Sequence, residues 1–122
     1  MVNRFDVWLV SPDPTQSHEI RKTRPCVIVS PDEVNGYLKT VTIAPMTSKS
    51  FEVPTRVGIV FDGKKGRIVL DQIRTVDRNR LLKCFGSLDK NTSSEVLAIL
   101  QSLFANSLSI RFWSVLVSPG QF

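Results

Sequence analysis

Short strand-like segments separated by short loops are the feature that most limits how this chain folds. Apolar and polar residues alternate around residues 5–10 and 40–44, which is typical of strands with one buried face. Residues 26–29 form a continuous apolar run, which predicts a strand buried on both faces. A further strand is expected over 52–61, with a hairpin partner over 67–70 after a glycine-containing loop. These segments lie too close together for the crossover helices that parallel strands need, so the sequence favours an antiparallel sheet.

Two capping motifs predict helices. Ser30-Pro31-Asp32-Glu33 has the capping-box spacing and predicts a short helix that Asn35-Gly36 ends. Thr92-Ser93-Ser94-Glu95 is a second capping box, and apolar residues recur at helical spacing over 96–104. A brief helical segment is also expected at 78–83. The chain is therefore predicted to be mostly β, a small closed or nearly closed barrel with an amphipathic helix packed against it near the C-terminus.

Length and charge limit the classes of protein that the chain can represent. Its 122 residues favour one domain, spanning 1–122, with one core. No apolar run approaches the roughly 18 residues of a membrane span, and charged residues begin within the first six positions. We therefore expect a cytoplasmic protein without a membrane partner. The net charge of +5 favours a polyanionic partner about as strongly as it indicates an ordinary soluble surface.

The cysteines do not indicate a disulfide framework or a metal site. Only Cys26 and Cys84 are present, both in apolar sequence contexts, and the chain has no Cys-x-x-Cys pair and a single histidine. We expect a reduced protein that needs no metal and no cofactor.

One polar loop concentrates residues that could carry chemistry. His18 and Glu19 are followed by the cations Arg21, Lys22 and Arg24, just before the buried strand. The proline after Arg24 restricts that arginine to extended geometry, and a planar guanidinium of fixed direction suits phosphate recognition. The alternative is that Arg24 pairs with a carboxylate such as Asp71 and only pins the loop.

Two further polar segments each end or follow a buried strand. Ala44 to Ser48 ends with the hydroxyls of Thr47 and Ser48, which on their own usually cap a turn. Residues 71–77 are polar and charged, and there the sequence favours Arg74 bridging Asp71 and Asp77 as a structural clasp.

Taken in order, these segments resemble a known family. Asp6 to Val10, Asp13-Pro14-Thr15, Ser17-His18-Glu19, Thr23-Arg24-Pro25, Pro45 to Ser48 and Leu70 to Asp77 are similar to the MazF/PemK/Kid toxins of bacterial toxin–antitoxin systems. The resemblance runs from about residue 3 to about residue 105. It implies a homodimeric SH3-like barrel with a C-terminal helix. It also implies a metal-independent endoribonuclease that cleaves single-stranded mRNA and is neutralised by a cognate antitoxin.

The resemblance also implies roles for individual residues. Arg24 and Thr47 match the arginine and the threonine that contact the scissile phosphate, whereas His18 and Asp71 match catalytic residues of one branch. That branch has an arginine two positions before its acidic residue, where this chain has Val69. The pair of Arg24 and Thr47 therefore fits the sequence better, and the general base is left between His18 and Glu19.

The chemistry implied is the attack of the RNA 2′-OH on the adjacent phosphate. Arg24 would stabilise the charged phosphorane, while Thr47 would donate a hydrogen bond to a non-bridging oxygen. No carboxylate cluster suited to two magnesium ions occurs in the sequence, in agreement with a metal-free route. The residues expected to bind RNA around this centre are Arg21, Lys22, Ser48, Lys49, Lys64 and Lys65.

Two other functions compete with this reading. One is a toxin of the same barrel fold that poisons DNA gyrase without catalysis, and the other is a non-catalytic nucleic-acid-binding barrel. The partners that the resemblance implies are single-stranded RNA, an acidic antitoxin, a second copy of the chain and, through the antitoxin complex, operator DNA. Residues 106–122 extend beyond the usual end of such chains, as an added strand, part of a dimer interface or non-native sequence.

Overall fold

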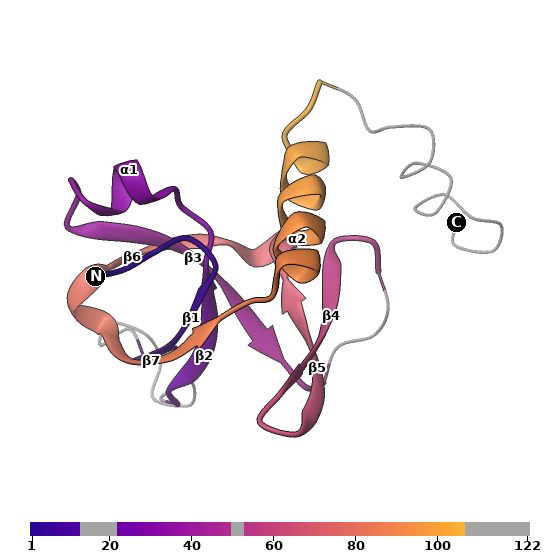
Figure 1. The fold of residues 1–122 in the computed structure, drawn as a ribbon, viewed down its shortest axis with the longest axis horizontal. Coiled ribbons are helices and arrows are strands. Elements are labelled where there is room, and N and C mark those ends of the chain that lie inside the picture. Colours follow the sequence, from indigo (N-terminus) through magenta and orange to yellow (C-terminus); the bar gives the residue numbers. More distant parts are fainter. Residues whose placement is uncertain (13–21, 50–52, 107–122) are drawn as a thin grey trace, which may run out of the picture.

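The fold is a strongly curled antiparallel sheet with one longer helix packed against it (Figure 1). The computed structural model describes residues 1–12, 22–49 and 53–106. The elements are β1 (Asp6–Val10), β2 (Arg24–Ile28), α1 (Asp32–Asn35), β3 (Thr40–Thr47), β4 (Arg56–Phe61), β5 (Lys64–Val69), β6 (Arg74–Asp77), β7 (Leu81–Ser87) and α2 (Lys90–Leu103), with 3-10 turns η2 (Leu70–Gln72) and η3 (Arg78–Arg80). The prediction of a mostly β, barrel-like fold with a C-terminal helix is confirmed.

Strand β3 connects the two halves of the sheet. The strand order is β4-β5-β3-β2-β1-β7, and β6 pairs with the first half of β3. Residues 43–45 of β3 pair with β2, whereas Met46 and Thr47 pair with β5. The last residues of β3 therefore lie where β2 and the β4–β5 hairpin meet.

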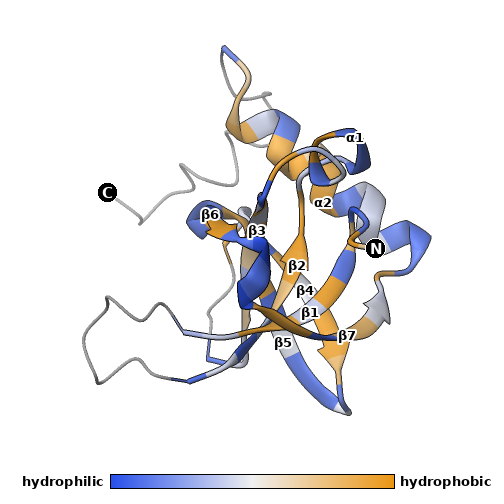
Figure 2. Ribbon diagram, turned by 90° about the vertical axis from the view of Figure 1, so that its left-hand side faces the viewer, coloured by the Kyte–Doolittle hydropathy of each residue, from blue (hydrophilic) through white to orange (hydrophobic). Residues whose placement is uncertain are grey.

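Two apolar clusters fill the two sides of the curled sheet. Val27 belongs to the cluster that α2 covers through Val96, whereas Cys26 and Ile28 belong to the other cluster. This alternation confirms that β2 is buried on both faces. Figure 2 shows the hydrophobic colouring of this strand, in contrast to the hydrophilic tip of the β4–β5 hairpin.

The β4–β5 hairpin is tighter than predicted. Its turn consists of Asp62 and Gly63, both with positive φ (54° and 74°), so β5 begins at Lys64 rather than at 67. Two consecutive positive φ values are the geometry that two-residue hairpins favour, because it matches the twist of the flanking strands. The turn therefore places Lys64 and Lys65 at the start of a strand.

Both predicted capping boxes are wrong, although both helices exist. The Ser30 hydroxyl donates to Asn35 Oδ1 (2.5 Å) and accepts from the Thr42 backbone N–H (3.0 Å), so it ties α1 to β3 instead of capping α1. Helix α2 begins before the predicted box, because Asp89 is the capping residue and accepts from the Thr92 backbone N–H at 2.7 Å.

The helical segment predicted at 78–83 is also wrong. Only Arg78–Arg80 form a single 3-10 turn, and the chain then continues as β7, which pairs with β1. Strand pairing outweighs the local pattern here, as tertiary context commonly does.

Neither cysteine of the chain forms a disulfide: Cys26 is buried and Cys84 is exposed. Within the described ranges, no helix has the length and apolar character needed to cross a membrane.

Candidate active site

An open groove of about 600 Å³ lies between the start of β2, the end of β3 and the β4–β5 hairpin. Seven of the residues expected from the sequence to bind or cleave RNA line it. They are Lys22, Arg24, Thr47, Ser48, Lys49, Lys64 and Lys65. Residues that are up to 43 positions apart in the sequence are thus brought to one surface.

The pairing of β2 with β3 explains why Arg24 and Thr47 line the same groove. Cys26 is opposite Pro45 in this antiparallel pair. Arg24 lies two residues before Cys26 and Thr47 two residues after Pro45, so both come from the same end of this strand pair. Arg24 is the first residue of β2, so its backbone is extended, as the sequence predicts for a residue that precedes a proline.

The hydroxyl of Thr47 is oriented by the backbone. Its Oγ1 accepts a hydrogen bond from the Lys49 backbone N–H at 3.2 Å. A hydroxyl that accepts from the protein still has its own O–H to donate. Thr47 can therefore donate to an oxygen bound in the groove.

The described lining of the groove is strongly positive. Five cations line it (Lys22, Arg24, Lys49, Lys64 and Lys65), against one carboxylate, that of Asp62. Such a concentration of positive charge in a concave surface attracts polyanions and raises their local concentration. The groove is suited to a phosphate backbone.

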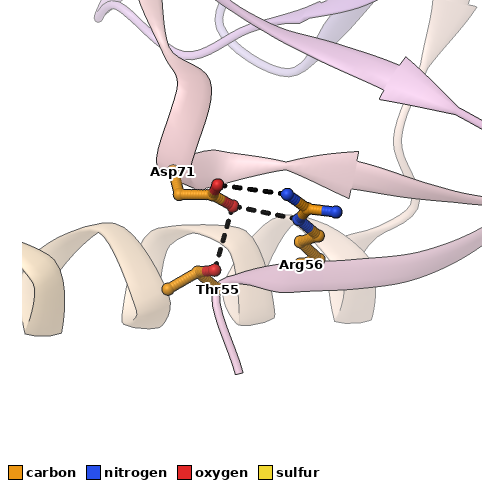
Figure 3. Close-up of polar contacts among 3 residues, drawn as sticks. All are labelled: Thr55, Arg56 and Asp71. Carbon is orange, nitrogen blue, oxygen red and sulfur yellow. Dashed lines mark hydrogen bonds and ion pairs between the residues drawn. The ribbon is translucent and has the colours of Figure 1, made fainter. Parts of the chain in front are cut away.

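Asp71 lies outside the set of described residues that line this groove. Its carboxylate accepts from Arg56, with Nε to Oδ1 at 3.2 Å and Nη2 to Oδ2 at 3.3 Å, and from the Thr55 hydroxyl at 2.9 Å (Figure 3). Arg56 is thus the partner of Asp71, in place of the Arg24 or Arg74 expected from the sequence. The cause is the β4–β5 register, which sets Arg56 opposite Val69 and so near η2.

The same contacts keep Asp71 charged. Partial burial on its own raises the pKa of the carboxyl, but the hydrogen bonds from Arg56 and Thr55 outweigh it and lower the pKa below its usual value. A carboxylate held in this way is a weak proton acceptor, which suits a structural clasp between the start of β4 and η2.

Cys26 is the third residue of β2, directly after Pro25, and its side chain is buried. Burial raises the pKa of its thiol to about 11, although the cations of Arg74, Arg24 and Arg80 act in the opposite direction. The thiol therefore stays protonated at neutral pH and is not a nucleophile there.

Three residues assigned to the site from the sequence, His18, Glu19 and Arg21, lie outside the described residues. Phe61 and Gly66 line the groove without having been expected there. Their position beside the Asp62-Gly63 turn, next to Lys64 and Lys65, is the sequence signal that could have found them.

In residues 1–12, 22–49 and 53–106, no group of three or more His, Cys, Asp or Glu is arranged to hold a metal ion.

Comparison with known families decides which family the chain belongs to. The model of the PemK-like, MazF-like toxins of type II toxin–antitoxin systems matches residues 3–104. The chain belongs to this family. Endoribonuclease MazF of Staphylococcus saprophyticus subsp. saprophyticus is 36% identical over 102 residues, which cover 79% of this chain and 85% of that protein.

Solved structures of the family share the fold. The MazE–MazF crystal structure (Form-II) from Deinococcus radiodurans superposes with a TM-score of 0.74 at 25% identity, over 87% of this chain and 97% of that one. A mycobacterial endoribonuclease in complex with its cognate antitoxin has a TM-score of 0.69 at 20% identity, over 83% of this chain and 92% of that one. The first of these neighbours was solved together with MazE and the second with its cognate antitoxin.

Proposed function

We propose that this MazF-like endoribonuclease toxin cleaves single-stranded RNA in the groove that Arg24 and Thr47 line, without a metal ion. The observation that supports this site best is the shared groove itself. It holds a directed guanidinium, an oriented hydroxyl and a surrounding set of cations. A phosphodiester needs these groups at its cleavage point.

The proposed reaction is an internal phosphoryl transfer. The RNA 2′-oxygen forms a bond to the adjacent phosphorus as its proton passes to a base. The bond from phosphorus to the 5′-oxygen then breaks, and that oxygen gains a proton. The products are a 2′,3′-cyclic phosphate and a 5′-OH. Arg24 offsets the charge that develops on the phosphorane, and Thr47 donates to a non-bridging oxygen.

We assign the general base to either His18 or Glu19. Both precede Arg24 by only five or six residues. Comparison of the pH–rate profiles of His18→Asn and Glu19→Gln distinguishes them, because only loss of the base removes the acidic limb of the profile. For Asp71, in contrast, we propose the structural role of a clasp rather than the catalytic role that one branch of the family suggests.

Around this centre, Lys22, Ser48, Lys49, Lys64 and Lys65 contact the phosphates next to the scissile one. Arg21 is assigned to the same set from its place in the sequence. These exposed contacts supply affinity that falls as salt is added, whereas Arg24 and Thr47 act on the reacting phosphate.

The partners proposed for the chain are an acidic antitoxin, a second copy of the chain and, through the antitoxin complex, operator DNA. The antitoxin is supported by the two neighbours solved with one. Dimer formation is supported by large apolar side chains on the surface, among them Tyr37, Leu38 and Leu82. Sedimentation at micromolar concentration tests it, since a species of 13.7 kDa alone would rule the dimer out.

The decisive experiment is incubation of the purified protein with single-stranded RNA in EDTA. We expect defined fragments that carry 5′-OH ends. The matched variants are Thr47→Ala, which should cleave slowly, and Thr75→Ala, an exposed threonine of β6 outside the groove, which should cleave normally. Intact RNA together with inhibition of gyrase supercoiling would favour the gyrase toxin. Intact RNA bound tightly would favour the nucleic-acid-binding barrel.

A further inference from the structure

A second open groove, of about 670 Å³, lies between the β4–β5 hairpin, the end of β7 and the start of α2. Strands β4 and β7 are the two ends of the main strand order, so this groove is the seam at which the barrel does not close. Phe61, Lys65 and Gly66 line both this seam groove and the groove of Arg24 and Thr47. The two grooves therefore adjoin along these three residues.

An exposed aromatic ring faces the seam groove. Phe85 is 43% exposed and lines the groove, and its ring meets the Phe61 ring edge to face, with centroids 5.3 Å apart and planes at 72°. The Lys83 ammonium lies 5.5 Å from the centroid of the same ring. Phe85 thus contacts a second aromatic ring, and a cation lies over its own ring.

A β-bulge places Phe85 in this position. In the β1–β7 pair, Val7 is opposite Gly86 and Trp8 is opposite Cys84, so Phe85 is the extra residue between two registers. Gly86, with φ of 122°, takes up the distortion in a conformation that L side chains rarely adopt. Bulges redirect side chains, and here the redirected side chain is the aromatic one.

The charge around the ring is mainly positive. Lys65 and Arg67 line the groove, and Lys83 is next to the ring. The carboxylate of Asp89 also lines it, but it is engaged as the cap of α2 through the Thr92 backbone N–H. A partly exposed ring beside cations is the surface on which single-stranded nucleic acids stack their bases.

We propose that the seam groove is a second nucleotide subsite of the RNA. In it, the base of a nucleotide that flanks the cleavage point stacks on Phe85, and the neighbouring phosphates contact Lys65 and Lys83. The proposal rests on the proposed function, because it requires RNA in the adjoining groove. In this proposal, Phe85 determines how long an RNA the protein prefers and which base it prefers beside the cleavage point. Phe85 does not contact the reacting phosphate.

The test compares two RNAs of the same cleavage sequence, one with only the nucleotides around the scissile bond and one extended by several nucleotides on each side. The variants are Phe85→Leu, which removes the ring but keeps an apolar side chain, and Phe85→Trp, which keeps a stacking surface. Phe104→Ala is the matched control, because Phe104 is 73% exposed at the end of α2 and lies outside the lining of both grooves. Urea unfolding checks that each variant is folded.

For each variant, kcat/KM for the extended RNA is divided by kcat/KM for the minimal RNA. We expect Phe85→Leu to lower this ratio about tenfold, because KM for the extended RNA rises. Phe85→Trp should keep this ratio, as should Phe104→Ala. An unchanged ratio in folded Phe85→Leu, while the wild type cleaves both RNAs, would overturn the subsite and leave the proposed function standing. Failure of the wild type to cleave any RNA would overturn both. If Phe85→Leu instead weakened only the binding of a synthetic peptide of alternating Glu and Leu, the groove would be a peptide site and the proposal wrong.

Discussion

Gly66 lies so close to Thr47 that a Cβ atom on residue 66 would stand 2.9 Å from the Thr47 carbonyl oxygen. Real Cβ atoms essentially never approach backbone atoms so closely. The contact arises because β5 pairs with the last two residues of β3, with Arg67 opposite Thr47. Because residue 66 has no side chain, the β4–β5 hairpin can lie this close to Thr47, whose hydroxyl is assigned to the scissile phosphate.

Gly66→Ala should therefore reduce RNA cleavage through kcat more than through KM. The added methyl group pushes the Thr47 backbone away from its place, and displacements of about 1 Å at a reacting centre lower rates by up to about 100-fold. Steady-state kinetics on one RNA measures the split. Gly36→Ala is the control, since a Cβ there would make an ordinary 3.5 Å contact with the Asp32 carbonyl oxygen. Equal kinetics for the two variants would exclude a positioning role for Gly66.

Asp71→Asn should destabilise the protein at neutral pH by no more than about 1 kcal/mol, because the Asp71 side chain is 34% exposed and solvent screens its ion pair. The folded state lowers the pKa of this carboxyl. The contribution of the ionised Asp71 carboxylate to the free energy of unfolding is therefore fully present above the unfolded-state pKa of about 3.9. It is lost as the pH falls through the lower pKa of the folded state.

Urea unfolding of wild type and Asp71→Asn at pH 7 and at pH 3 measures this contribution. The difference between the two proteins should shrink at the lower pH. A difference that grows on acidification would contradict the clasp with Arg56. A folded Asp71→Asn protein that no longer cleaves RNA would return Asp71 to the catalytic residues.

An acidic peptide with interspersed apolar residues, taken from the cognate antitoxin, should inhibit cleavage in competition with RNA. The five cations of the groove attract carboxylates as they attract phosphates. The apparent affinity should fall with added salt, since attraction between exposed charges is screened over roughly 8 Å at physiological ionic strength. It should persist in part, because apolar side chains of the peptide also bury surface. A peptide that binds tightly yet leaves cleavage unchanged would show that it occupies another surface.

Much of the fold follows from local patterns, and the failures have physical causes. The buried run at 26–29 and the stop at Asn35-Gly36 are correct because neighbouring residues decide them. The sequence does not predict β7, because residues 81–87 form a strand by pairing with β1, a contact that the local pattern does not contain. The capping box predicts the start of α2 too late, because Asp89 caps the helix ahead of the serine- and threonine-rich segment.

The groove shows the same division. Arg24 and Thr47 were predictable as residues of this groove, because their motifs follow each other in a recognisable order, and the lysines were predictable from their charge. The partner of Asp71 was not, since it depends on the β4–β5 register, which sets Arg56 opposite Val69. The role of Gly66 was likewise unpredictable, because it depends on a distance between two strands.

The central claim is that Arg24 acts on the scissile phosphate, and single-turnover cleavage of one RNA in EDTA by Arg24→Ala tests it most directly. Arg74→Ala is the matched control, because Arg74 is an exposed arginine of β6 outside the groove lining. Both variants should unfold near the wild-type urea concentration. We predict that Arg24→Ala cleaves about 100-fold or more slowly, whereas Arg74→Ala cleaves near the wild-type rate. A folded Arg24→Ala protein that cleaves as fast as the wild type would contradict the account.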